Sequence, residues 1–552
     1  MRFRWLKTVG IGGRTLPCIL AAFVVIGGAA VHAQEKSPPT ADHTKFESLK
    51  GPFTSGPEVT RACLACHTEA AKQVMSSIHW KWDYTHPVTG ETLGKRNVIN
   101  AFCGNVASNE PRCTSCHAGY GWEDESFDFS DETRVDCLVC HDTTGDYVKF
   151  DVKAGHPLYE PLTRKGGHVY PDSLKQKSGG MTTYLPPDLA KVSQAVGEPG
   201  RANCGACHFY GGGGDGVKHG DLDSSLVSPP VEVDVHMSPD GADLTCTDCH
   251  TAHGHQWPGS RYLGTVRDDN RGKPGFRRRD VASCQSCHTS TPHSTASIEG
   301  LKLNDHTDRV ACQTCHIPEF ARGGVATKTW WDWSTAGKLK DGKPYAEEDE
   351  HGHHSYLSKK GHFVWEENVV PDYAFWNGVV DYSLLGEKID PSGVVPVNKI
   401  YGSAEDPGSR IYPFKRMRGK QAYDRDNNNL VLTNVFGPET DTAFWTNFDW
   451  DKSISAAMAK TDVPYSGNYD FVETEMWWPT THMVAPAKSA LSCGDCHARD
   501  GRLSGLSGFY LPGRDLFKTT DRIGLSILVL SLVGILGHSS VRIVMSRRRK
   551  RT

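Results

Sequence analysis

Hydrophobic residues gather in two long runs at the ends of the chain. The first, LPCILAAFVVIGGAAV, follows a basic stretch and ends near VHA at 31–33, a pattern typical of a signal peptide over residues 1–33. The second, IGLSILVLSLVGILGHSSVRIVM at 523–545, is long enough for a transmembrane helix, since a bilayer core needs about 20 apolar residues. The pattern therefore predicts one cleaved segment and one C-terminal anchor.

The basic segment SRRRKRT at 546–552 sets the expected orientation of that anchor. By the positive-inside rule it stays in the cytoplasm, which leaves residues from 34 to about 520 on the outer side. We expect a main domain over 34–515 on the periplasmic side of a bacterial inner membrane.

Between the two runs, the chain is poor in material for a core of side chains. Only 38% of the 552 residues are hydrophobic, with 56 glycines and 31 prolines. A net charge of −4 gives no indication of nucleic-acid binding. We predict a mainly α-helical chain with much irregular loop and little sheet, which wraps around apolar bulk from another source.

The cysteines indicate that source. Sixteen of 18 lie in eight copies of the pattern C-x-x-C-H. The paired cysteines are Cys63 and Cys66, Cys113 and Cys116, Cys137 and Cys140, Cys204 and Cys207, Cys246 and Cys249, Cys284 and Cys287, Cys312 and Cys315, and Cys493 and Cys496. The closing histidines are His67, His117, His141, His208, His250, His288, His316 and His497. Only Cys18, inside the predicted signal peptide, and Cys103 remain.

C-x-x-C-H is the attachment signature of c-type haem. Each thiol can form a thioether with a vinyl group of the porphyrin, and the adjacent histidine supplies the proximal imidazole to iron. Zinc sites or disulfides are the alternative, but a zinc site does not need a histidine after every cysteine pair. The sequence therefore predicts a multihaem cytochrome c with eight covalently bound haems c in one stack.

The motifs are unevenly spaced. Seven lie between Cys63 and His316, and the eighth follows 176 cysteine-free residues that are rich in tryptophan and tyrosine. We expect this interval to pack across the haem core rather than form a separate domain, because it must return the last motif to the stack.

Each electron-transfer haem needs a sixth ligand, usually a second histidine in multihaem chains. Our candidates for this distal position are His79, His219, His236, His255, His293, His306 and His482, with His253, His156 and His168 in reserve. His538, in the membrane segment, is a candidate contact to a quinone or a membrane cytochrome, or a residue that simply reaches the interface.

Cys103 lies ten residues before the second motif and has no predicted partner. A free thiol in an oxidising compartment tends to be oxidised or mispaired, so Cys103 is a candidate for chemistry. The alternative is a buried structural thiol.

The chain resembles the octahaem tetrathionate reductase family. The resemblance is carried by the eight motifs with one long gap, NAFC at 100–103, residues 186–223 (PPDLAKVSQAVGEPGRANCGACHFYGGGGDGVKHGDLD), and the TWWDWSTAG and PFKRMRGKQAYD segments. It covers nearly all of residues 50–500. It implies that the haem of the second motif carries a distal lysine and forms the active site, with a cysteine, an asparagine and an aspartate nearby. Carried over by position, these residues are Cys103, Asn100, Asp188 and Lys191, with Lys149 as a rival ligand.

The resemblance implies reduction of tetrathionate to thiosulfate, with the other haems feeding electrons to the second. A thiolate at Cys103 could attack sulfur, Asn100 could orient the anion, and Asp188 could hold Lys191. The expected partners are tetrathionate or another small oxyanion, the inner membrane, and a quinol-linked or membrane cytochrome donor. Nitrite or hydroxylamine reduction is the enzymatic alternative, and an electron conduit with eight bis-histidine haems is the non-enzymatic one.

Overall fold

Most helices in this protein are short, and many coincide with C-x-x-C-H motifs. The computed structural model describes residues 40–99, 104–165, 169–266, 282–437, 441–515 and 517–549. The predicted signal peptide, Asn100, Cys103 and His168 lie outside these ranges. The helices are α1 (Gly56–Leu64), α2 (Ala70–Ser76), α3 (Ile78–Lys81), α4 (Leu138–His141), α5 (Leu189–Gln194), α6 (Arg201–His208), α7 (Cys246–Cys249), α8 (Gln285–His288), α9 (Ile298–His306), α10 (Cys312–His316), α11 (Phe444–Asn447), α12 (Trp450–Met458), α13 (Cys493–Cys496) and α14 (Lys518–Arg549).

The strands lie mainly in the second half of the chain. They are β1 (Tyr84–Thr85), β2 (Thr92–Leu93), β3 (Leu162–Lys165), β4 (Lys175–Ser178), β5 (Met181–Tyr184), β6 (Thr327–Asp332), β7 (Leu339–Lys340), β8 (Lys343–Pro344), β9 (Ala346–Glu348), β10 (His354–Leu357), β11 (Gly361–Glu366), β12 (Asp372–Trp376), β13 (Val380–Tyr382), β14 (Val395–Pro396), β15 (Asn398–Ile400), β16 (Arg410–Asp424), β17 (Asn429–Leu430) and β18 (Tyr469–Pro479).

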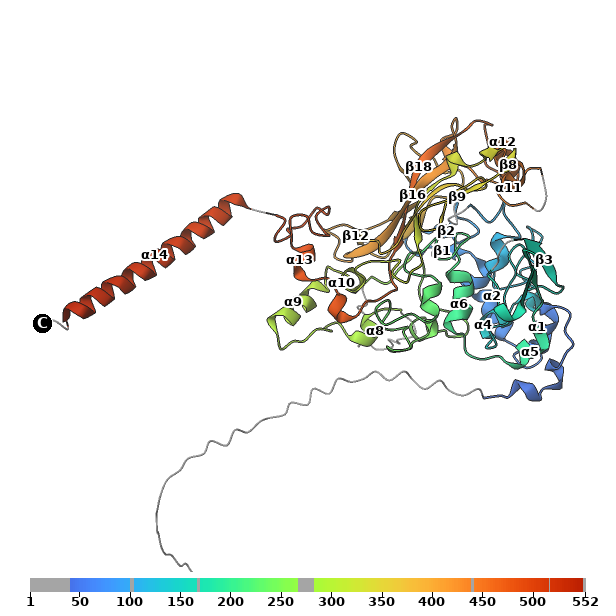
Figure 1. The fold of residues 1–552 in the computed structure, drawn as a ribbon, viewed down its shortest axis with the longest axis horizontal. Helices are drawn as coiled ribbons and strands as arrows, with labels where there is room; N and C mark the ends of the chain where they lie inside the picture. Colours follow the sequence, from blue (N-terminus) through green and yellow to red (C-terminus); the bar gives the residue numbers. More distant parts are fainter. Residues whose placement is uncertain are drawn as a thin grey trace, which may run out of the picture. The chain divides into compact units, whose positions relative to one another are not determined.

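The long interval before the eighth motif forms a nine-stranded sheet, drawn in yellow to orange in Figure 1. The strand order is β14-β18-β16-β6-β11-β10-β9, and β12 and β17 also pair with β16. The expectation of little sheet was therefore wrong for this part of the chain. The helical, loop-rich description fits the motif-bearing residues before it.

The two long strands of the sheet follow from their side-chain patterns. In β18 the residues Val472, Thr474, Met476 and Trp478 are buried and their neighbours are not, which is the period of two that a strand imposes. β16 is buried along most of its length, as suits a central strand. The two strands run antiparallel from the pair Phe414 and Pro479 to the pair Asp424 and Tyr469.

The sheet shares a hydrophobic core with the motif-bearing part of the chain. Ile99 and Val217 belong to the same cluster of buried side chains as Trp331, Met417 and Trp478. Lys415 of β16 also donates to the carbonyls of Val217, at 2.9 Å, and Lys218, at 3.2 Å. The interval thus packs directly on the segment that follows the fourth motif.

Several motif turns are capped by their own side chains. In α7 the carboxylate of Asp248 accepts from the backbone N–H of Thr245 at 2.7 Å, and in α13 Asp495 accepts from that of Ser492 at 2.7 Å. This is the capping-box arrangement, in which the residue at the third helical position satisfies the N-cap amide. The turn that presents both thiols is therefore held by local bonds.

α14 is the one helix, among the residues that the structure describes, whose length and composition would let it cross a membrane. Its apolar side chains are exposed, and its last turn carries Arg547, Arg548 and Arg549. These features are those of the anchor that the sequence predicts.

Gly419 offers a test of the central sheet. A Cβ atom at this position in β16 would lie 2.3 Å from the Trp331 carbonyl oxygen of β6, so Gly419→Ala should destabilise the fold by about 1–3 kcal/mol. We expect a lower midpoint of thermal unfolding by circular dichroism. Gly393→Ala is the matched control, because a Cβ there meets no atom within 4 Å. Equal midpoints for the two variants would contradict the packing described for β16.

Candidate haem sites and candidate active site

In six of the eight motifs, the closing histidine faces a second histidine. The ring centres are 6.3 Å apart for His67 and His43, 6.4 Å for His141 and His255, 6.2 Å for His208 and His79, 5.9 Å for His288 and His236, 6.3 Å for His316 and His293, and 6.0 Å for His497 and His306. Metal–imidazole bonds of about 2 Å put two opposed ring nitrogens about 4 Å apart and the ring centres about 6 Å apart. The paired rings therefore fit bis-histidine ligation of one iron.

The Nδ1 atoms of several motif histidines and facing histidines support a common ring orientation. The Nδ1 atom lies within hydrogen-bond distance of an oxygen in His141 (Gly197 carbonyl, 2.8 Å), His250 (Pro258 carbonyl, 2.9 Å), His255 (Gln73 Oε1, 2.9 Å), His306 (Lys302 carbonyl, 2.7 Å) and His497 (Pro512 carbonyl, 3.1 Å). A hydrogen bond at Nδ1 fixes the tautomer and leaves Nε2 available to a metal.

The fifth motif has His482 as its neighbour. His482 lies close enough to His250 to contribute to the lowered pKa of that imidazole, after burial as the main cause. Its Nδ1 atom is 3.2 Å from Oδ2 of Asp221, the carboxylate–histidine arrangement that orients metal ligands.

His219, a predicted distal ligand, does not face a motif histidine among the described residues. Its ring lies edge-on to Trp478 at 5.1 Å, and its Nδ1 atom is 4.0 Å from Asp221. The first motif instead faces His43, which the sequence analysis missed. His43 lies 24 residues before His67, and no local pattern marks it.

Contacts between cysteines show the order in which the motifs lie. Cys63 lies against Cys137, Cys116 against Cys207, Cys204 against Cys246, and Cys284 against Cys312. Weaker electrostatic contacts join Cys140 to Cys204, Cys249 to Cys284, and Cys315 to Cys496. The motifs therefore form the row 1-3-4-5-6-7-8, and the second motif branches from the fourth.

The second motif is built differently from the other seven. Among the described residues, no second histidine faces His117; its ring is surrounded by Trp80, Trp82, Trp122 and Phe127 at centre distances of 4.8–5.5 Å. Burial lowers its pKa to about 3, so the imidazole is neutral. Its Nε2 atom lies 2.7 Å from the Trp80 carbonyl, and its Nδ1 atom is buried without a partner.

The residues of the second motif fit a haem in part. Cys113 to Cys116 form a single 3-10 turn, so the thiol spacing is the same as elsewhere. Iron binding through Nε2 requires this atom to leave the Trp80 carbonyl, either by a shift of the His117 side chain or by a rotation of its ring. No such rearrangement is needed at the facing pairs.

Two lysines that the sequence analysis proposed as ligands are engaged elsewhere. The Lys191 side chain is 61% exposed and pairs with Asp146 at 2.7 Å, while Asp188 caps α5 by accepting from the N–H groups of Ala190 and Lys191. Lys149 is buried, but its Nζ donates to the carbonyls of His117 and Gly119 and pairs with Asp136 at 3.2 Å. Neither amine is available to the second haem without losing these partners.

Lys218 lies close to both the second and the fourth motif, and its amine has no carboxylate partner among the described residues. Desolvation, followed by the nearby charges of Arg261 and Lys95, holds its pKa well below the usual range, and Cys116 is among its electrostatic neighbours. Its Nζ lies 4.7 Å from the centre of the Trp478 ring, and no described carboxylate is within ion-pair distance. Asp215 and Lys218 have the spacing D-x-x-K, as do Asp188 with Lys191 and Asp146 with Lys149, so the spacing does not choose among the three lysines.

Two further cations lie near Lys218 and also lack a carboxylate partner among the described residues. Lys95 donates weakly to the Cys113 carbonyl at 3.4 Å and lies 4.0 Å from the Trp82 ring centre. Arg261 donates to the Tyr262 hydroxyl at 2.6 Å and lies over the Tyr382 ring at 5.2 Å. Lys95 and Lys218 therefore lie near Cys116 of the second motif, Arg261 lies near Lys218, and none of these three side chains, here called the cationic border, has a carboxylate partner among the described residues.

Asn100 and Cys103 lie outside the described residues, and hydrogen bonds hold the loop from residue 104 to the second motif. Asn109 donates to the Thr433 carbonyl at 3.0 Å and accepts from the N–H of Val435 at 3.0 Å. Asn105 accepts from Ser108 at 2.8 Å. These bonds join the loop before the second motif to the segment that follows β17.

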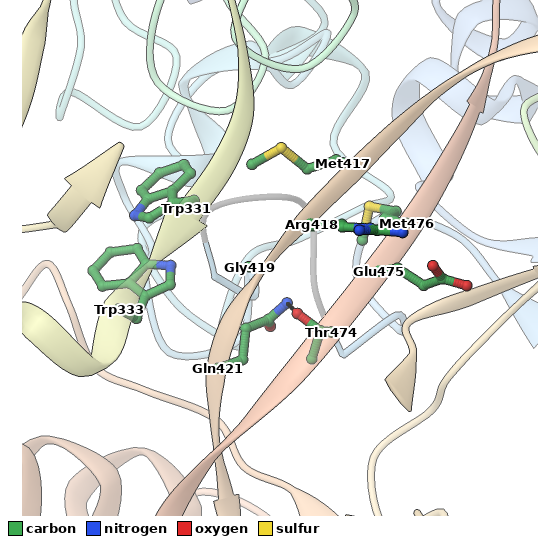
Figure 2. A pocket seen from close by; sticks show the side chains of 9 residues that line it. All are labelled: Trp331, Trp333, Met417, Arg418, Gly419, Gln421, Thr474, Glu475 and Met476. Carbon is green, nitrogen blue, oxygen red and sulfur yellow. Dashed lines mark hydrogen bonds between the residues drawn. The ribbon is translucent and has the colours of Figure 1, made fainter. Parts of the chain in front are cut away.

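A small cavity in the large sheet is not a substrate site. It is lined by Trp331 and Trp333, whose rings stack at 4.9 Å, and by residues of β16 and β18 (Figure 2). Its volume of about 30 Å³ is enough for a single water molecule.

Matched variants separate the two distal assignments. His43→Met should convert one bis-histidine signal in the electron paramagnetic resonance spectrum of the oxidised protein to a histidine–methionine signal, with a raised reduction potential. His219→Met should leave the bis-histidine signals unchanged. The reverse pattern would restore His219 as a ligand and remove His43.

Comparisons with known proteins agree with this geometry. Two family models match the chain, "Cytochrome c bacterial" over residues 328–500 and "Cytochrome c554 and c-prime" over residues 245–317. An uncharacterized protein of Archaeoglobus fulgidus is 24% identical over 255 residues, which cover 39% of this chain and 80% of that protein. The crystal structure of octaheme cytochrome c from Shewanella oneidensis is 42% identical, covers 85% of this chain and 97% of its own, and superposes with a TM-score of 0.71. The chain belongs to the octahaem c-type cytochromes and carries eight covalently bound haems c.

Proposed function

We propose that this protein is a membrane-anchored periplasmic enzyme that reduces tetrathionate to thiosulfate at the second haem. The observation that carries the proposal is the difference between the second motif and the other seven. In place of a second histidine it has the half-buried Lys218, with Lys95 and Arg261 beside that lysine, and none of the three has a carboxylate partner among the described residues. An electron conduit would need only facing histidines, as at the other motifs.

The reaction suits a site with these charges. Tetrathionate is a dianion, and two electrons break its central S–S bond to give two thiosulfate dianions, with no proton consumed. The haems supply single electrons when bound. The chain's own residues must attract the anion, hold its sulfur–sulfur bond near the second motif and tolerate the charge that develops there.

We assign the distal lysine to Lys218 in place of Lys191. A lysine binds a metal only as the neutral amine, and burial among cations lowers the pKa of Lys218 in the direction that favours this form. Asp215 takes the place of Asp188 in the D-x-x-K spacing. It accepts from the backbone N–H of Ser224 at 2.9 Å and so fixes the loop that carries Lys218.

Lys95 and Arg261 supply the positive charge that the substrate needs. Charge-assisted hydrogen bonds to anions are roughly twice as strong as neutral ones, and a guanidinium can bind two oxygens of one sulfonate-like group. Cys103 and Asn100 remain proposals from the family resemblance, as nucleophile toward sulfur and as anion-orienting amide.

Electrons for the reaction come from the membrane in this proposal. A signal peptide places the chain outside the inner membrane, α14 anchors it there, and a quinol-linked or membrane cytochrome donor reduces it. His538 lies in α14, where it is a candidate contact to that donor.

Nitrite or hydroxylamine reduction is the second candidate. It consumes protons, and the hydroxyl of Tyr382, whose ring Arg261 lies over, is a group that can donate one. The same cationic border would attract nitrite. Assays with both classes of substrate on one preparation distinguish the candidates.

The lysine assignment is testable with matched variants. Lys218→Ala should lower tetrathionate reduction by about 10²-fold or more, in the range seen when one polar group of a catalytic site is removed, and should change the spectrum of one haem. Lys191→Ala, on the exposed surface, should stay within about twofold of wild type. The measurement is oxidation of reduced methyl viologen by tetrathionate, with electron paramagnetic resonance of the oxidised protein. A wild-type rate and spectrum for Lys218→Ala would remove Lys218 from the site.

Arg261→Gln tests the role of the cationic border. Loss of one charge that binds the anion in ground state and transition state alike should raise KM for tetrathionate about tenfold or more with little change in kcat. Arg261→Lys should recover part of the affinity because it keeps the charge. A fall in kcat at unchanged KM would instead indicate that Arg261 acts only in the transition state.

A further inference from the structure

The segment between the eighth motif and α14 is folded onto that motif. The Pro512 carbonyl lies 3.1 Å from Nδ1 of His497, so the residue that closes the motif is oriented by this segment. The next residue, Gly513, has φ +90°, and a Cβ there would lie 2.2 Å from the His497 carbonyl oxygen. The two stretches of backbone therefore approach as closely as glycine alone allows.

Internal bonds make this segment a closed loop. The guanidinium of Arg514 donates to the Phe509 carbonyl at 3.1 Å, to the carbonyl of Leu506, and to Asp515 at 2.8 Å. Asp515 in turn accepts from the backbone N–H of Leu511 at 2.7 Å. The last residues before the anchor are thus held by bonds to the loop itself.

The loop is also fixed to the large sheet. Leu503 and Leu511 are 4% exposed and pack in one cluster with Ile411 of β16. The Arg502 N–H donates to the Asp495 carbonyl at 2.8 Å, which joins the start of the loop to α13. Residues 498–515 have the contacts of a packed element rather than those of a flexible linker.

Two exposed aromatic residues lie at the anchor end of the loop. Tyr510 and Phe517 are 54% and 60% exposed, and their rings stack with centres 5.2 Å apart. Phe517 directly precedes α14. Aromatic residues that flank a membrane helix concentrate at the lipid headgroup level, so this pair marks the expected membrane surface.

The stretch of chain between the eighth motif's contact at Pro512 and the start of α14 is short. Six residues lead from Pro512 to Lys518, the first residue of α14, and they can span at most about 20 Å when fully extended. The eighth motif is also an end of the row of motifs, and Cys493 and His306 are exposed there. The first motif is the other end of that row.

We propose that residues 498–515 form a rigid connector that holds the eighth haem motif at the membrane surface, where a quinol-oxidising protein of that membrane docks and delivers electrons. The inference rests on the anchoring proposed above and adds the entry point. The donor oxidises one quinol to quinone and releases two protons and two electrons, and two electrons are what one tetrathionate requires.

α9 supplies the apolar part of the docking face. This helix ends at His306, which faces His497, and it exposes Ile298 and Leu301 with 76% and 48% of their surface. An apolar patch beside an exposed haem motif suits a partner that is itself held in the same membrane, because two tethered proteins need little affinity to meet.

A tether series tests the connector. Insertion of 30 glycine and serine residues between Asp515 and Lys518 lowers the effective concentration of the eighth motif at the membrane, roughly as the −3/2 power of the tether length. We expect reduction of the haems in spheroplasts supplied with a short-chain quinol, followed by optical spectroscopy, to slow about tenfold. Reduction by dithionite and retention after an alkaline wash should not change.

The matched control is the same insertion between Gly179 and Gly180, in the exposed β4–β5 turn where neither glycine contacts another segment. It should leave the quinol-driven rate unchanged. Leu301→Glu should slow that rate severalfold, whereas Val88→Glu, at another exposed apolar residue, should not. An anchored protein whose quinol-driven rate is the same with and without the tether insertion would overturn the inference.

Other outcomes separate this inference from the proposed function. Release of the wild-type protein by the alkaline wash would overturn both the anchoring and the entry point. Loss of quinol-driven reduction on tether insertion, in a protein that does not reduce tetrathionate with an artificial donor, would support the entry point and overturn the substrate.

Discussion

The arrangement of the motif-bearing chain depends on imidazole rings that face one another across about 6 Å. Each facing pair joins a motif histidine to a residue from another part of the sequence, such as His43, His79 or His306. The apolar clusters of this part of the chain are small, so ligation across these pairs adds substantially to what holds the segments together. Metal ligation that requires two separate segments converts ligand binding into folding energy, so holo and apo chains should differ greatly in stability.

The second motif has no facing histidine among the described residues, and the charged side chains around it also differ from those at the other motifs. At the second motif, Lys95 and Arg261 bring formal charge close to the half-buried amine of Lys218, with no carboxylate partner among the described residues. Such an arrangement costs stability and is retained where charge has a use. The proposed anion site would account for the lysine and the two cations together.

The sequence predicted the features that depend on the spacing of neighbouring residues. It missed contacts between residues that are far apart along the chain. Each haem motif is a pattern of five consecutive residues, so the sequence alone predicts all eight attachment sites. His79, His236, His255, His293 and His306 lie near motif histidines as expected, but His43 has no local signal that separates it from other histidines. Lys218 and Lys149 share the D-x-x-K spacing of Lys191, so spacing could not identify the ligand. It also could not show that the Lys191 side chain is exposed and that Lys218 is half-buried. The large sheet was missed because the prediction for the interval before the eighth motif used its tryptophan and tyrosine content and not the alternation of apolar and polar residues, as in FVETEMWW at 471–478.

The branch at the fourth motif has a consequence for electron storage. The route from the eighth motif to the second passes through the seventh, sixth, fifth and fourth, and leaves the first and third aside. Haems at the first and third motifs are not needed for this route, but they increase the number of electrons that the protein can hold. In the proposed reaction, which takes two electrons at once from a donor that docks at intervals, two haems beside the route would hold an electron pair between dockings. The first and third haems would thus store electrons beside the route that leads to the second motif.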